Sequence, residues 1–127
     1  LAFSVNAKES VYLVEGINLF NKKEFDKAKF KFEQDIVFNP KNEKSYLYLS
    51  KIFNKKEKGK LEEKNLQTVI LLNPKNEEAT FNLAKLKLKE SDFQGSKDLV
   101  EKLLIFCKDY CAKSKKLKSE IEISLKK

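Results

Sequence analysis

Cys107 and Cys111 are the two residues of this sequence whose type and spacing most directly suggest chemistry. Thiols four residues apart on a helix share one face, where they could form a local disulfide or supply half of a zinc site. The chain contains no histidine, so we expect neither a complete zinc site nor an ordinary acid–base pair near neutral pH. The pattern favours two small, half-buried residues near the end of a helix, and it leaves open whether they are free thiols or form a local disulfide.

Other catalytic machinery is also missing from the sequence. The three glycines, Gly16, Gly59 and Gly95, lie too far apart to form a loop that cradles a phosphate. Acidic residues occur mostly beside lysines, which is typical of the outer faces of helices. A thiol nucleophile would need a neighbouring base as well as a lowered pKa. We therefore predict a protein without enzymatic activity, cofactor or bound metal.

The net charge of +8 rests on 27 lysines and no arginine. A basic domain of this kind could bind nucleic acid or an anionic membrane, for example through Lys113, Lys115, Lys116 and Lys118. Readout of base edges depends on the planar fork of arginine, so specific nucleic-acid recognition is not expected. Solvated lysines on outer helix faces are the favoured interpretation. No apolar run approaches the roughly 20 residues that a helix needs to span a bilayer.

These side chains must be positioned by a repeated helical unit. The pentapeptide Asn-Pro-Lys-Asn-Glu occurs at Asn39–Glu43 and again at Asn73–Glu77. The distance between the two copies defines the period of the repeat, and it is typical of a helix-turn-helix array, in which each unit buries its apolar face on its neighbours. The prolines are expected to end one helix of each unit, and the acids to begin the next helix.

Apolar residues that recur every three or four positions predict seven helices, with a polar connection over residues 54–60 and a Ser91-Asp92 cap before the sixth helix. The stripes expected to face inward are, in chain order, Val11, Val14, Ile17, Leu19 and Phe20; Ala28, Phe32, Ile36 and Val37; Tyr46, Leu47, Leu49, Ile52 and Phe53; Leu61, Leu66, Val69, Ile70 and Leu72; Phe81, Leu83, Leu86 and Leu88; Leu99, Val100, Leu103, Leu104 and Phe106; and Leu117, Ile121 and Leu125. The last stripe is narrow, as in a terminal helix whose outer face meets water.

The repeats resemble the tetratricopeptide family. The first repeat carries the resemblance best, with Tyr12, Gly16, Phe25, Ala28, Phe32 and Pro40 on the family's signature positions. The second repeat matches at Tyr46, Leu49, Ser50, Leu66 and Pro74 but has Gly59 and Glu62 where an aromatic and a small residue are usual. The third matches at Leu83, Ala84, Phe93 and Ser96 and departs at Thr80, Lys87 and Lys108. The signature therefore fades toward the C-terminus.

The resemblance implies an all-α fold, a right-handed α-solenoid of antiparallel helix pairs with about seven helices. We divide the chain into an N-terminal tether at 1–8, repeats at 9–42, 43–76 and 77–110, the third degenerate, and a capping helix at 111–127. The family's first helices line a concave surface. The corresponding residues here, our predicted groove residues, are Leu13, Ile17, Phe20, Leu47, Tyr48, Lys51, Asn54, Lys55, Phe81, Asn82, Lys85, Leu88 and Lys89.

Such a groove suits an extended or helical protein segment with apolar anchors and acidic residues, with Asn54 and Asn82 as hydrogen-bond partners for its backbone. Family members that clamp a chaperone's terminal carboxylate carry lysine and asparagine in the first repeat, asparagine in the second and basic residues in the third. The corresponding positions in this chain are Leu13, Ile17, Tyr48, Glu78 and Asn82. We therefore do not expect that subtype. The apolar end of the groove could instead be covered by the N-terminal tether, a preceding domain or a second copy of the chain.

The resulting hypothesis is a non-catalytic scaffold for protein–protein interaction, in a bacterial cell-envelope or assembly complex. The composition, rich in lysine, asparagine, isoleucine and phenylalanine, is typical of an AT-rich genome. The envelope or periplasm is favoured over the cytoplasm because the chain begins at Leu1, so a signal or anchor could precede it. The alternatives are an electrostatic binder of nucleic acid or anionic membrane, and a structural subunit that associates with itself.

Overall fold

The computed structural model describes residues 9–127, and this part of the chain contains helices and no strands. The predicted tether at 1–8 lies outside the described residues. The seven helices are α1 (Val11–Asn21), α2 (Phe25–Phe38), α3 (Glu43–Lys55), α4 (Gly59–Leu72), α5 (Glu77–Lys89), α6 (Phe93–Phe106) and α7 (Cys111–Leu125). The predicted number of helices and the all-α class are confirmed. One boundary differs, because α3 ends at Lys55 and α4 begins at Gly59, so both helices extend into the segment 54–60 that was predicted to be a polar connection.

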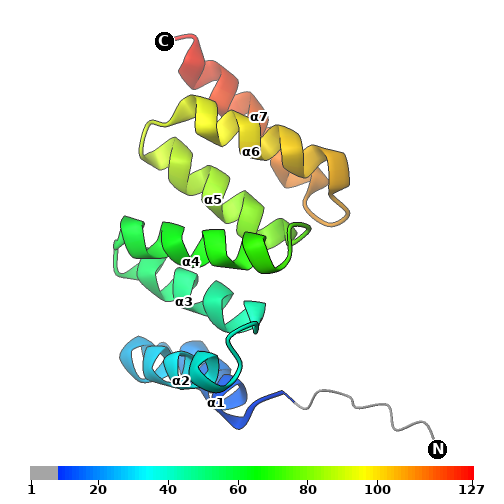
Figure 1. Ribbon diagram of the computed structural model, residues 1–127. Helices are drawn as coiled ribbons and strands as arrows, with labels where there is room; N and C mark the ends of the chain where they lie inside the picture. The colour runs from blue at the N-terminus through cyan, green and yellow to red at the C-terminus, as the bar shows by residue number, and fades with distance from the viewer. Residues whose placement is uncertain (1–8) are drawn as a thin grey trace, which may run out of the picture.

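Each helix packs mainly against its neighbours in the sequence, which makes the molecule a one-dimensional stack. The closest pairs are α1 with α2, α3 with α4, and α5 with α6, while α7 packs on α6 and more weakly on α5. Figure 1 shows α2, α4 and α6 lying one above another, with their C-terminal ends toward the same side of the molecule. This is the solenoid of antiparallel helix pairs that the period predicts.

The turn inside each pair has the same backbone conformation in all three repeats. Lys23, Glu57 and Ser91, which are separated from one another by one period of the repeat, have positive φ angles of 61°, 55° and 65°. The following backbone N–H groups then bond back to carbonyls near the end of the preceding helix, as in Lys58 to Phe53 at 2.9 Å. A left-handed residue at this position is the usual way to end a helix, although glycine adopts it most easily.

We predict that Lys23→Gly stabilises the protein by about 0.5–1 kcal/mol, because glycine removes the steric cost of the left-handed conformation. The measurement is the free energy of unfolding from urea titration followed by circular dichroism. Lys22→Gly is the matched control, since Lys22 has a φ of −83°. It should lower stability by a similar amount, because there glycine adds only freedom in the unfolded chain. Equal effects of the two changes would contradict the argument.

Small residues allow the two helices of each pair to approach closely. Gly16 faces the fully buried ring of Phe32, and a Cβ at Gly16 would lie 2.6 Å from a carbon of that ring. The equivalent positions in the next repeats hold Ser50 and Ala84, which are also buried. The helix contact predicted at Gly16 is therefore required by sterics, because a larger residue there would displace the aromatic ring.

Several apolar residues that were expected to face inward are exposed. These corrections are Val11, Val14, Val37, Leu61 and Leu125, with exposed fractions of 68%, 44%, 75%, 40% and 43%. Among the described helices α1 packs only on α2 and α3, so its remaining face meets no neighbour. Val37 directly follows the partly buried Ile36, and a helix turns by about 100° per residue, so the two cannot face the same way.

The repeated pentapeptide joins each repeat to the next through its glutamate. The Glu43 carboxylate accepts hydrogen bonds from the side-chain amides of Asn73 and Asn76, at 3.1 and 2.8 Å. The Glu77 carboxylate accepts the backbone N–H of Lys108 at 2.5 Å and those of the next two residues. The hydrogen bond from Lys108 is the main cause that lowers the pKa of Glu77. The pentapeptide is thus a structural device, as its position at helix boundaries predicts.

Asp35 corrects the expectation that acidic residues lie on outer faces. Its side chain is fully buried near the end of α2. The carboxylate accepts hydrogen bonds from the Ser45 hydroxyl at 2.5 Å and from the amides of Asn39 and Asn42 at 3.0 and 2.8 Å. The first copy of the pentapeptide is therefore anchored to α2 by a buried carboxylate, and three polar groups satisfy it.

Cys107 and Cys111, whose bonding state the sequence left open, form a disulfide. Helix α6 ends at Phe106 and α7 begins at Cys111, so the two residues flank a turn instead of lying on one continuous helix. The turn brings their Cα atoms to 5.4 Å, within the usual range for a disulfide. The disulfide covalently links the end of the third repeat to the start of α7.

Candidate functional site

The structure brings together seven of the predicted groove residues around a hollow of about 380 Å³. We call it the central hollow. These seven are Phe20 from α1, Lys51, Asn54 and Lys55 from α3, and Asn82, Lys85 and Lys89 from α5. Ser50, Glu62 and Leu86 complete the lining. First helices of three successive repeats therefore supply most of this surface, as the period of the repeat implies.

Lysine side chains dominate the charge of the central hollow. Lys51 is neutralised, because its Nζ lies 2.7 Å from the Glu78 carboxylate and 4.9 Å from the centre of the Tyr48 ring. Within residues 9–127, Lys55, Lys85 and Lys89 form no ion pair. All three are exposed. They outnumber Glu62, the acid in the lining, and the resulting excess of positive charge over the hollow attracts anionic groups.

One buried carboxylate lies at the edge of this positive field. Glu62 is only 5% exposed and accepts two hydrogen bonds of 3.3 Å from the Asn54 amide. Burial raises the pKa of the Glu62 carboxyl above its ordinary value, although Asn54 and Lys89 oppose the change. The sequence pointed to Glu62 only as a departure from the small residue expected there. Its contact occupies the Asn54 amide that was predicted to bind a ligand's backbone.

A second hollow of about 320 Å³ continues the surface toward the C-terminus. We call it the distal hollow. Lys85 lines both hollows, and Phe81 and Leu88 of α5 form the apolar side of the distal one. Helix α7 contributes Lys113, Lys116, Leu117 and Glu120. This contribution was not predicted from the sequence, since α7 was assigned only to capping; the apolar stripe through Leu117 was the signal.

Four predicted groove residues do not line either hollow. Leu13 is 1% exposed and packs in the core beside Phe32, while Leu47 is 9% exposed and packs against Leu66. Both are therefore corrected to core residues, and neither lines the central or the distal hollow. Ile17 and Tyr48 are partly buried against the first core, where the Tyr48 ring stacks on Phe32 with centroids 5.1 Å apart.

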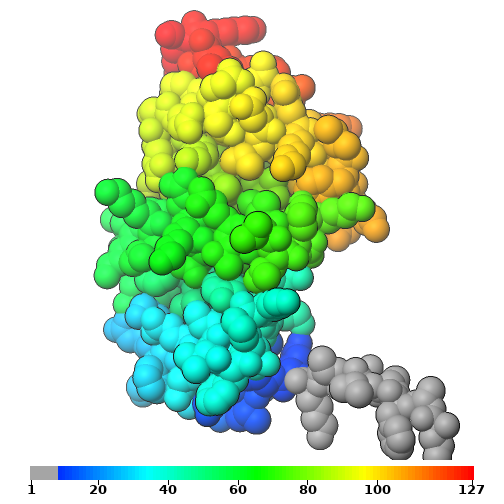
Figure 2. Space-filling model, in the orientation of Figure 1, coloured from blue at the N-terminus to red at the C-terminus, as the bar shows by residue number. Residues whose placement is uncertain are grey.

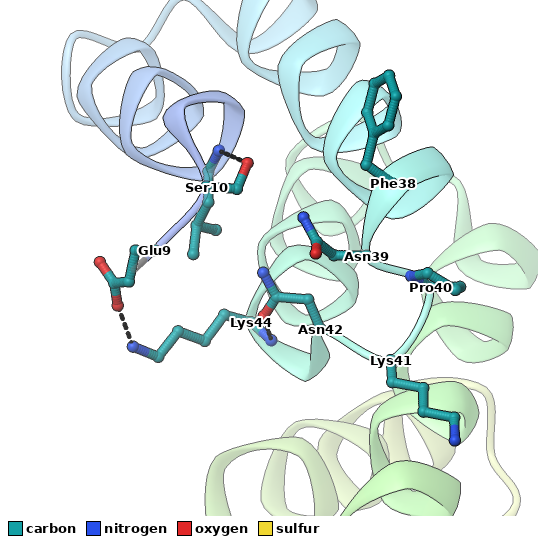
Figure 3. A pocket seen from close by; sticks show the side chains of 9 residues that line it. Glu9, Ser10, Phe38, Asn39, Pro40, Lys41, Asn42 and Lys44 are labelled. Atoms are coloured by element: carbon teal, nitrogen blue, oxygen red, sulfur yellow. Dashed lines mark hydrogen bonds and ion pairs between the residues drawn. The ribbon is translucent and has the colours of Figure 1, made fainter. Parts of the chain in front are cut away.

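A third hollow, of about 580 Å³, lies elsewhere (Figure 3), between the start of α1, the end of α2 and the start of α3. Leu13, Phe38 and the first pentapeptide line it. Its lysine Lys44 is paired with Glu9 at 2.5 Å, and its asparagines Asn39 and Asn42 already bond to Asp35. Among the described residues, Lys41 is the one lysine of this lining without an ion pair, whereas three such lysines line the central hollow.

The basic cluster of α7 divides between two faces. Lys113 and Lys116 line the distal hollow, and Lys113 lies 4.9 Å from the centre of the Tyr110 ring. Lys115 and Lys118 line none of the hollows described above. No helix over residues 9–127 is long and apolar enough to cross a membrane. The same residues contain no group of three or more histidine, cysteine or acidic side chains arranged to hold a metal ion.

Comparison with known proteins identifies the fold. No family model and no curated protein matches the sequence. The first TPR domain of Spaghetti (RPAP3) bound to an HSP90 peptide superposes with a TM-score of 0.84 at 14% identity, covering 92% of each chain. The Sgt2 TPR domain of Aspergillus fumigatus gives 0.76 at 18% identity, over 91% of this chain and 80% of that one.

A bacterial structure is similar to the same extent. The Yersinia enterocolitica type III secretion chaperone SycD, in complex with a peptide of the translocator YopD, gives a TM-score of 0.82 at 10% identity. The match covers 88% of this chain and 90% of that chain. At these identities the likeness concerns the fold alone. The chain has the tetratricopeptide-repeat fold, as its period and signature residues predict.

Proposed function

We propose that this chain, which has the tetratricopeptide-repeat fold, is a non-catalytic module that holds a segment of a partner protein in its concave groove. The observation that carries the proposal is the set of three unpaired lysines, Lys55, Lys85 and Lys89, around the central hollow. Three like charges beside a single buried carboxylate, that of Glu62, repel one another, and this repulsion costs stability. An anionic ligand offsets that repulsion when it binds.

The two hollows together suggest the chemistry of the ligand. Acidic side chains or a terminal carboxylate suit the central hollow, where lysines supply charge-assisted hydrogen bonds. A bulky apolar side chain suits the distal hollow, against Phe81, Leu88 and Leu117. Because Lys85 lines both hollows, the acidic residue and the apolar anchor would be close together in the ligand. Two of the similar structures, those of Spaghetti and SycD, have peptides bound, which supports this use of the fold.

The structure also bears on the chaperone-tail subtype. Leu13 is buried at one of the clamp positions, and Glu78 places an acid at another, where it pairs with Lys51. We therefore propose an acidic and apolar segment as the ligand without assigning it to a chaperone tail. The absence of catalysis is supported by the disulfide, because both thiols that the sequence offered as nucleophiles are bonded. A role in a bacterial envelope or assembly complex stays a prediction.

A peptide-display selection on the whole chain tests the proposal. We expect enriched peptides to combine one or more acidic residues with a neighbouring bulky apolar residue. A photo-crosslinker placed on such a peptide should label residues of α5 and α7, identified by mass spectrometry. Enrichment of basic peptides, or labelling confined to the outer helices α2, α4 and α6, would count against the groove.

A further inference from the structure

The start of α7 lacks the groups that usually stabilise the first turn of a helix. A side chain caps the first turn of α1, α3, α5 and α6, and an acid lies in the first turn of α2 and α4. Among the helices of residues 9–127, only α7 has neither, and its first turn carries Lys113. A positive charge at the N-terminus of a helix opposes the helix dipole. The first turn of α7 is therefore weak by itself.

The disulfide fixes this turn at its first residue. Helix α7 begins at Cys111, which is bonded to Cys107 directly after the end of α6. The Glu77 carboxylate also holds the connection between the two helices, but its hydrogen bonds end at the backbone N–H of Tyr110, one residue before α7. The covalent bond thus extends the anchoring of the connection into the helix.

The same turn forms part of the distal hollow. Lys113 lines the hollow, and its Nζ lies 4.9 Å from the centre of the Tyr110 ring. That ring in turn lies 5.4 Å from the ring of Phe81, which lines the hollow from α5. These contacts connect the first turn of α7 to the opposite wall. A displacement of the turn would therefore move Lys113 and loosen the aromatic contact with α5.

A reductant in solution can reach the disulfide, since both cysteines are partly exposed. Figure 2 shows the connection between α6 and α7, in orange, at the surface of the molecule. A dithiol such as dithiothreitol attacks one sulfur as its thiolate, which breaks the S–S bond and forms a mixed disulfide. Its second thiol then displaces the remaining cysteine. The two electrons and two protons that the dithiol loses convert both cysteines to thiols.

Reduction would leave most of α7 in place. Leu117 and Ile121 are buried in the core formed with Val100 of α6 and Ala84 of α5, and these contacts do not involve the disulfide. The loss of the covalent bond therefore acts on the weak first turn alone.

We propose that the Cys107–Cys111 disulfide is a redox-sensitive switch for the distal hollow. When the disulfide is formed, the first turn of α7 is fixed and the hollow holds the apolar anchor of the ligand. When it is reduced, the turn is released, and the ligand binds less tightly because binding must order the turn again. The effect on the ligand rests on the proposed function of the groove, whereas release of the turn can be measured without a ligand.

Hydrogen exchange followed by mass spectrometry on the whole chain, with and without dithiothreitol, tests the release. The amides of residues 114–117 report it, because in a helix they bond to carbonyls of residues 110–113, as Ser114 does at 2.9 Å. We expect them to exchange about tenfold faster after reduction, with α5 unchanged. The variant Cys107→Ser/Cys111→Ser should exchange fast in both conditions. Exchange that reduction leaves unchanged would overturn the proposal.

An acid added to the first turn should compensate for the missing disulfide. Ala112 is exposed in that turn, so Ala112→Glu should slow the exchange of residues 114–117 in the reduced chain about threefold. Ser119→Glu is the matched control, since Ser119 is exposed in the middle of α7 and the added charge is the same. Equal slowing by the two variants would contradict the weakness assigned to the first turn.

The consequence for binding is measured by titration calorimetry with a cysteine-free peptide selected on the oxidised chain. We expect its affinity to fall about tenfold when dithiothreitol is added, and to be unaffected by dithiothreitol in Cys107→Ser/Cys111→Ser. Equal affinity for the oxidised and reduced chains would overturn the switch while leaving the groove intact. A selection that enriches no peptide would instead contradict the proposed function, and hydrogen exchange would then decide whether the disulfide holds the turn.

Discussion

Replacing Asp35 by alanine is expected to lower the free energy of unfolding by about 3 kcal/mol, because it leaves the buried Ser45 hydroxyl and two asparagine amides without their shared acceptor. The Ser45 hydroxyl and the Asn39 and Asn42 amides now share this one carboxylate, and the alanine side chain accepts no hydrogen bond. Urea unfolding followed by circular dichroism measures the change.

The control is Asp98→Ala, at an exposed acid that accepts a hydrogen bond from Gln94. It should cost less than about 0.5 kcal/mol. A loss at Asp35 no larger than that of the control would contradict the role assigned to it.

The same carboxylate gives the stability a defined dependence on pH. Burial acts to raise the pKa of Asp35, but hydrogen bonds from Ser10, Ser45, Asn39 and Asn42 outweigh it and hold the pKa below its ordinary value of 3.8. A carboxyl with a lowered pKa stabilises the folded state fully above its unfolded pKa, and this contribution disappears as pH falls through the folded pKa. The difference in stability between wild type and Asp35→Ala should therefore be constant near neutral pH and shrink in acid. A difference that grows in acid would contradict the assignment.

Reversing the charge of Lys85 and Lys89 together is expected to weaken binding of a selected acidic peptide by about 100-fold. Each lysine can give a charge-assisted hydrogen bond to the ligand, and each glutamate adds repulsion in its place. Titration calorimetry on Lys85→Glu/Lys89→Glu measures the loss. The two side chains are exposed, so the fold should be unaffected, and circular dichroism checks this.

The matched control for the groove reverses two lysines outside it. Lys60 and Lys64 lie exposed on α4 and line neither the central nor the distal hollow. The variant Lys60→Glu/Lys64→Glu changes the net charge by the same amount, so it reports the effect of overall charge alone. We expect it to reduce affinity only a fewfold, and less at higher salt. Equal losses in the two variants would show that binding follows net charge and would remove the case for the groove.

Residues of the first repeat show how much of the helix packing could be predicted from sequence. Gly16, Ala28 and Phe32 were identified from the family pattern, and all three are buried at the contact between α1 and α2. Their roles are predictable because close helix packing requires small side chains at fixed positions. Leu13 was placed in the groove by the same pattern, and the structure places it in the core. The pattern identifies a helix but leaves open which of the helices packed beside it a given side chain contacts.

In the candidate site, the lysines and Phe20 were predictable from their positions in each unit, whereas the contribution of α7 was not. Lys113, Lys116 and Leu117 lie beyond the last repeat, so no register assigned them to the groove. Glu62 was visible as an unusual residue, but its burial and its bond to Asn54 depend on the packing of α3 against α4. Whether a polar contact forms between two helices depends on shifts of a fraction of an ångström in how the helices pack. Residue types alone do not specify those shifts.

The sequence by itself determined the period, the seven helices and the turns that separate them, because helix formation and helix ends depend on residues close together in the chain. Tertiary structure decided which faces are covered. It buried Asp35 and Glu62, brought Cys107 and Cys111 into a disulfide, and left Val37, Leu71 and Ile105 exposed. These outcomes depend on which helix lies beside which, and that arrangement joins residues about one repeat apart whose contacts no local pattern specifies.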